Sequence, residues 1–271
     1  MTTTTHTPAS TPGPDSLARI LHTGRRETTP ARRITMWARV RLELRKAVNT
    51  RSGTVLTVAT LAWAPLVLIA WIAATGTDGH ALDTVLGVGA TGVAILLPIV
   101  TLLQVSGEWG QRSVLTTFSL DPARGRVLAA KVLAGQILAL AVIVSCLGFS
   151  LLTAALIGVD LADGSLGPTL LGIGAGGMLY ALMGSALGAL ALSTALGVGL
   201  LLVGPQLVLN LGPLAGDRWA DIGPWVEIST RLGELTGGSV AHWGHLAVAG
   251  LVWIVVPLAV GAWRVRRADV A

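Results

Sequence analysis

Cysteine is nearly absent from this 271-residue chain, in which Cys146 is the only one. A lone thiol forms no internal disulfide and cannot build a cysteine-ligated metal cluster. Cys146 lies inside a long apolar run, where we expect it to act as a packing residue. The sequence therefore predicts no catalytic, cofactor or metal site that depends on cysteine.

Charged residues are also few, at 12% of the chain, and none of them falls within six long apolar runs. Each run is close to the roughly 20 residues that a helix needs to cross a bilayer. With 52% apolar residues and a mean hydropathy of +0.72, a soluble domain would expose too much apolar surface. We therefore predict an all-α membrane protein with six transmembrane helices, at residues 54–75, 84–104, 132–159, 168–192, 195–214 and 244–263.

The basic residues are distributed asymmetrically between these runs. Ten lie before the first run, four lie between residues 105 and 131, and three follow the last run, which leaves only Arg218 and Arg231 for the alternate segments. Cytoplasmic segments retain Lys and Arg, so both termini are expected in the cytoplasm. The net charge of +5 then favours anionic membrane lipids as partners, and we expect no nucleic acid binding. The Arg-rich, Lys-poor composition favours a bacterial inner (plasma) membrane.

The segment before the first run has two parts. Residues 1–30 are rich in Thr, Pro, Ser and Gly and are expected to form a disordered cytoplasmic tail, which leaves residues 31–271 as the six-span transmembrane domain. The first apolar run begins too late for a cleaved signal peptide. Ahead of it, apolar and basic side chains recur on opposite arcs, which predicts an amphipathic interfacial helix rather than a merely basic flanking segment. Its residues include Trp37, Val40, Arg41, Leu44 and Arg45.

The apolar stretch from 168 to 214 is long enough to cross a ~30 Å core twice, with Ser193 and Thr194 as the expected turn. Glycines at four-residue spacing in its first half favour close packing within one bundle over a dimer seam. The segment from 215 to 243 mixes three Trp with acidic residues. We expect it to rest on the outer surface as one or two short helices, or as a loop with Trp anchors.

The sequence lacks residues that three kinds of membrane protein require, namely P-loop ATPases, ion-coupled carriers and intramembrane serine proteases. Neither Lys46 nor Lys131 follows a glycine, so the chain contains no P-loop and no ATPase site of its own. The apolar runs contain no charged side chain, which disfavours an ion-coupled carrier. An intramembrane serine protease would need Ser185 with His242 or His245, but Ser185 lacks two of the glycines that flank the nucleophile of rhomboid proteases. We expect the Ser185 hydroxyl to bond to the preceding helical turn.

The gap after the second run is longer than a simple hairpin requires. Val114, Leu115 and Phe118 would share one helix face, and Pro122 would end that helix. A short charged helix of this kind, held between two membrane helices, predicts a docking surface.

This segment resembles the cytoplasmic loop of type 2 ABC transporter permeases. In that family a Glu after the second span precedes a Gly-Thr-Leu-like triplet, a Pro, a small residue, an Arg and a Lys that opens the third span. Arg112-Ser113 stands here where the family has Gly-Thr, and the likeness covers about residues 34–271. The matching residues are Glu108, Arg112-Ser113-Val114-Leu115, Pro122, Arg124 and Lys131.

The resemblance implies a permease half that pairs with a second half, commonly a copy of itself, and with a cytoplasmic ABC ATPase subunit that binds ATP and Mg. The chain would be no enzyme itself, and would form the path for export of an amphipathic or hydrophobic substrate, such as a drug, an antibiotic peptide or a lipid-linked molecule. The alternative is a non-transporting subunit for sensing or surface assembly. The loop would be the coupling helix, and its implied ATPase contacts are Glu108, Trp109, Arg112, Ser113, Leu115, Phe118, Asp121, Pro122, Arg124 and Arg126.

Overall fold

A computed structural model describes residues 35–110, 123–162 and 164–267 of the chain. The described residues form helices and no strands. The predicted tail at 1–30 lies outside them, and Met36 onward forms one compact unit.

Six helical segments in the described part are long and apolar enough to cross a membrane, which confirms a multi-pass membrane protein. The sixth is interrupted by a π-helical stretch between two α-helical parts. The segments are α3 (Arg51–Thr75), α4 (Leu82–Gly110), α6 (Arg124–Leu156), α7 (Leu166–Ala191), α8 (Thr194–Leu211), and α11 (Trp243–Gly250), η2 (Leu251–Val255) and α12 (Val256–Arg267) taken together.

Helices α4 and α6 extend beyond the predicted apolar runs into charged sequence. Helix α4 continues through Glu108, and α6 begins at Arg124, eight residues before the predicted start at 132. Lys131 therefore lies in the third turn of a long helix rather than at its first residue. This extension places charged side chains of α4 and α6 on continuous helices, where neighbouring helices fix their positions.

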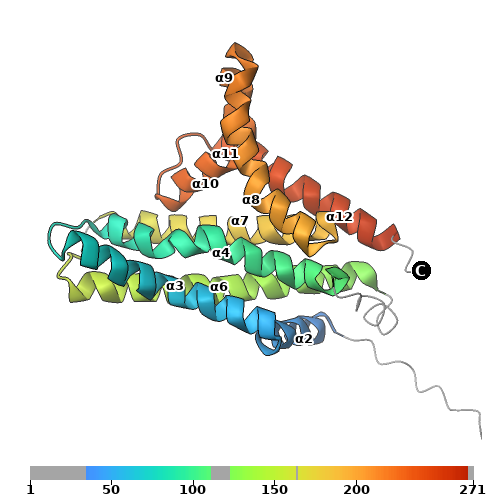
Figure 1. The fold of residues 1–271 in the computed structure, drawn as a ribbon, viewed down its shortest axis with the longest axis horizontal. Helices are drawn as coiled ribbons and strands as arrows, with labels where there is room; N and C mark the ends of the chain where they lie inside the picture. Colours follow the sequence, from blue (N-terminus) through green and yellow to red (C-terminus); the bar gives the residue numbers. More distant parts are fainter. Residues whose placement is uncertain (1–34, 111–122, 163, 268–271) are drawn as a thin grey trace, which may run out of the picture. The chain divides into compact units, whose positions relative to one another are not determined.

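Helices α3, α4, α6 and α7 lie side by side, and the closest packing is between α4 and α7 (Figure 1). Glycine makes this packing possible. A Cβ atom at Gly184 would collide with the Pro98 carbonyl oxygen, and one at Gly188 would lie 2.8 Å from the Leu102 carbonyl oxygen. The glycine spacing of α7 thus serves packing within this chain, as predicted.

Helices α7 and α8 are joined by a two-residue turn. Leu192 adopts the left-handed conformation with φ of 50°, and Ser193 is extended at the start of α8. The Leu192 N–H donates to the Gly188 carbonyl at 3.2 Å. This confirms the predicted turn, shifted by one residue.

The segment from 215 to 243 forms short helices, as the sequence predicts, and its place on the outer membrane surface stays a prediction. It contains α9 (Asp217–Val226) and α10 (Ile228–Thr236), preceded by the short η1 (Gly212–Ala215). Helix α10 packs against α7 and buries Ile228, Leu232 and Leu235 in the same cluster as Met183 of α7. The apolar side of α10 therefore packs against α7.

The turn between α9 and α10 is held by two hydrogen-bonded groups. The indole N–H of Trp253, in the π-helical stretch, donates to the Val226 carbonyl at 2.8 Å. The Glu227 carboxylate is buried and accepts from the backbone N–H groups of Ser229 and Thr230 at 2.7 and 2.9 Å, which caps α10. A carboxylate is thus buried at the turn between α9 and α10.

Candidate functional site

The site begins with helix α2 (Met36–Asn49), which precedes α3 and packs against α6. Val40 is buried against Ala130 and Ala134 of α6, with Met36 and Leu44 beside it. Small alanines on α6 let the α2 backbone approach closely. Glu43, three residues after Val40, lies on the same side of α2 and is therefore buried as well.

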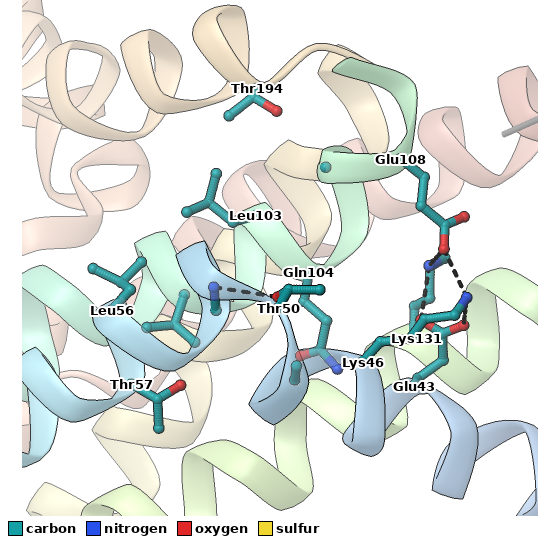
Figure 2. Close-up of a pocket in the computed structure, with 14 residues that line it drawn as sticks. Glu43, Lys46, Thr50, Leu56, Thr57, Leu103, Gln104, Glu108, Lys131 and Thr194 are labelled. Carbon is teal, nitrogen blue, oxygen red and sulfur yellow. Dashed lines mark hydrogen bonds and ion pairs between the residues drawn. The ribbon is translucent and has the colours of Figure 1, made fainter. Parts of the chain in front are cut away.

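Four charged side chains from α2, α4 and α6 meet there with alternating sign (Figure 2). We call these residues the four-charge cluster; they are Glu43, Lys46, Glu108 and Lys131. One Glu43 oxygen lies 2.8 Å from Lys131 Nζ and the other lies 2.9 Å from Lys46 Nζ. A single Glu108 oxygen accepts from both lysines, at 2.8 Å from Lys46 and 2.9 Å from Lys131. Every member therefore contacts both members of opposite charge.

How deeply these side chains are buried determines how much stability is lost when one of them is removed. The side chains of Glu43 and Lys131 are only 6% and 7% exposed, whereas that of Lys46 is 37% exposed. Removing one partner of a buried pair leaves an uncompensated charge and costs about 3–5 kcal/mol, even where the intact pair adds little net stability. The cluster consequently fixes which surfaces of α2, α4 and α6 meet.

Lys46 keeps its charge in this setting. Partial burial alone would lower its pKa, but the hydrogen bonds to Glu108 and Glu43 and their negative charges outweigh burial, so the pKa lies above its ordinary value of 10.5. The ammonium group is thus charged across the physiological pH range.

A pocket of about 460 Å³ adjoins the cluster. Its charged end consists of the four side chains, and its walls come from the first turns of α3, the last turns of α4 and the start of α8 (Figure 2). The apolar walls include Leu56, Val100 and Leu103, and the uncharged polar groups are those of Thr50, Thr57, Gln104 and Thr194.

The predicted coupling residues fall partly inside the described structure. Glu108 is a cluster member, and Arg124 and Arg126 lie in the first turn of α6, half-buried and exposed respectively. Trp109 lies at the end of α4, with its side chain outside the described part. Arg112, Ser113, Leu115, Phe118, Asp121 and Pro122 also lie outside the described residues.

The predicted interfacial residues all lie on α2. Val40 is buried and Leu44 half-buried against α6, whereas Trp37, Arg41 and Arg45 are exposed. The interfacial position of the helix stays a prediction. The cluster itself was missed, although its sequence signal exists: Glu43 is the only acidic residue of α2 and lies on the apolar side beside Val40.

Ser185 has the predicted partner within its own helix. Its hydroxyl donates to the Ala181 carbonyl at 3.1 Å, and its side chain is fully buried in the packing between α4, α6 and α7. This is a packing role for Ser185.

No family model matches the chain, and no curated protein matches it either.

Proposed function

We propose that this protein is the permease subunit of an ABC transporter, driven by a separate ATPase subunit that docks on residues 111–123. The observation that carries the proposal is the four-charge cluster. It ties the last turns of α4, where the segment 111–123 departs, to the early turns of α6, where it returns, and to α2. A loop that only connects two membrane helices does not require a buried network of ion pairs at its ends.

The cluster supplies a mechanical reason for coupling. Glu108 is tied to Lys131, so a displacement of the docking segment acts on α4 and α6 together. Lys46 and Glu43 extend the same connection to α2 and thence to α3. Coupling requires that the ATPase bind two permease states with different affinity. Helices joined by buried ion pairs can switch between two discrete positions more readily than a loose loop can.

The proposal includes the orientation of the helices in the membrane. The end of the bundle that carries α2, Arg124 and the basic end of α12 faces the cytoplasm of a bacterial cell, because these elements hold most of the basic residues. Only 22% and 17% of the residues in the apolar spans of α3 and α8 are buried within the chain, which leaves lipid or a second permease half to cover the rest. The cargo is an amphipathic or hydrophobic molecule that is exported.

The test is purification of the tagged full chain in mild detergent from its native host, with identification of co-purifying proteins and an ATP hydrolysis assay. We expect a stoichiometric P-loop ATPase with the wild-type chain and its loss with Arg112→Glu, which reverses charge in the docking segment. Arg218→Glu, at an exposed position of α9, is the matched control and should retain the ATPase. Recovery of the chain alone, without ATP hydrolysis, would contradict the proposal.

A further inference from the structure

The pocket beside the four-charge cluster contains polar groups without partners. Among the described residues, neither the Nε2 nor the Oε1 atom of Gln104 has a hydrogen-bond partner, and the same holds for the Thr57 hydroxyl. These atoms are also shielded from solvent. A buried, unpaired amide or hydroxyl is costly, and such groups in a native protein usually mark a ligand, a water or an ion.

The position of Gln104 makes its amide adaptable. The Gln104 side chain lines the pocket from α4 (Figure 2). Its Oε1 atom lies near α6, since a Cβ atom added at Gly135 would be 3.3 Å from it. Gln side chains have three rotatable torsions, so the amide can turn from this packed position into the pocket without movement of α4. Thr57 lines the same pocket from α3.

The charge of the pocket limits what can bind. Among the described residues, its lining carries two carboxylates and two ammonium groups, which are paired with one another at 2.8 to 2.9 Å. A charged ligand would have to break these pairs or stay without a counter-ion. An uncharged headgroup with both a donor and an acceptor would instead satisfy the Gln104 amide and the Thr57 hydroxyl.

The remaining walls define the rest of the ligand. Leu56, Val100 and Leu103 provide an apolar surface, and a volume of about 460 Å³ is in the range of sites for drug-sized molecules. The pocket lies between membrane-spanning helices at the same end as α2, where a molecule partitioned in the bilayer would present its headgroup.

We infer that this pocket binds an uncharged amphiphile from the membrane, whose hydroxyl or amide headgroup pairs with Gln104 and Thr57 and whose apolar part lies against Leu56, Val100 and Leu103. Binding is a property of this chain alone. Only the further step, that the bound amphiphile is cargo, rests on the proposed function.

The test uses the full chain in phosphatidylcholine nanodiscs, without any ATPase, and three photoactivatable probes with one shared acyl chain. They are a monoacylglycerol, which donates and accepts hydrogen bonds, the methyl ester of the same fatty acid, which only accepts, and the free fatty acid, which is charged. We expect the monoacylglycerol to label peptides of α3 and the end of α4 at about tenfold lower concentration than the ester, as two added hydrogen bonds imply.

Variants assign the preference to named atoms. Gln104→Leu should reduce monoacylglycerol labelling to the level of the ester, and Thr57→Val should reduce it in part. Gln206→Leu is the matched control, because Gln206 is exposed on α8 outside the pocket, and it should leave labelling unchanged. Gln104→Leu also removes an unpaired amide, so it should raise the melting temperature of the ligand-free protein while it reduces the rise caused by the monoacylglycerol to that caused by the ester.

Equal labelling by the three probes, preference for the fatty acid, or full labelling of Gln104→Leu would each overturn the inference. A pocket that holds only water would give the first of these results. Because no ATPase is present, such a failure would leave the proposed permease function untouched, and absence of an ATPase partner would leave pocket binding untouched.

Discussion

Glu43 shows how much one side chain can determine in a membrane protein. Its two carboxylate oxygens bind different lysines, one from its own helix and one from α6. Because Glu43 and Lys131 are almost fully buried, the loss of either one leaves the cluster with an unbalanced charge away from solvent. Their contribution to stability therefore belongs to the pair.

A double-mutant cycle measures this dependence. Glu43→Gln and Lys131→Met should each destabilise the protein, by at most about 3–5 kcal/mol, because each leaves the buried cluster with one net charge. The double variant keeps Lys46 paired with Glu108 and should recover most of the loss. Arg41→Met, at an exposed position of α2, is the control and should have little effect. Thermal unfolding in detergent checks the cycle, and strictly additive losses would contradict it.

The pH dependence of α2 packing follows from Lys46. Its pKa is raised in the folded protein above the ordinary 10.5, so its stabilising contribution is complete below about that pH and is lost as the pH rises through the folded-state pKa. Lys46→Arg, which cannot lose its charge, should keep more stability under alkaline conditions than the wild type. Melting temperatures measured across alkaline pH test this, and identical profiles for both proteins would exclude a role for Lys46 titration.

At the scale of elements, the contact of α4 with α7 depends on missing side chains. Gly184→Ala should destabilise the protein by about 1–3 kcal/mol, because the added methyl group meets the Pro98 carbonyl, which is backbone and cannot rotate away. Gly199→Ala is the matched control: this glycine is exposed on α8 and has nothing within 4 Å of its Cβ position. The control should be neutral or slightly stabilising. Equal melting temperatures for the two variants would argue against the close contact.

The turn between α9 and α10 provides a second test of an element. Val226 is half-buried beside Trp253, whereas Leu214 of η1 is 82% exposed. In a Cys146→Ala background, we expect a membrane-impermeant maleimide to label Leu214→Cys quickly and Val226→Cys slowly. Equal rates would contradict the partial burial of Val226 at this turn.

At the scale of the whole molecule, the six spans could be predicted because charge and hydropathy report directly on the bilayer as solvent. The position of α10 could not be predicted in this way. Ile228, Leu232 and Leu235 are spaced as one apolar helix face, but a short helix of this kind suits a membrane interface and a protein interior equally. Only packing against α7 distinguishes the two.

The candidate site was predictable in part. Glu108 and Lys131 were selected through a family resemblance, but their contact with Glu43 and Lys46 joins residues 62 to 88 positions apart, and such pairings leave no periodic signal in one sequence. The pocket depends on unpaired atoms of Gln104 and Thr57, and sequence gives no indication of which polar side chains lack partners.

The central claim is that the four-charge cluster transmits movement between the ATPase and the spans. The most direct measurement is the ATP hydrolysis rate of the purified complex relative to that of the free ATPase subunit. We expect the complex and the free subunit to differ, because coupling acts in both directions. Glu108→Gln should retain the bound ATPase but bring its rate to that of the free subunit. Glu234→Gln alters the distant ion pair with Arg231 and should behave as wild type. A Glu108→Gln complex with the wild-type rate would contradict the account.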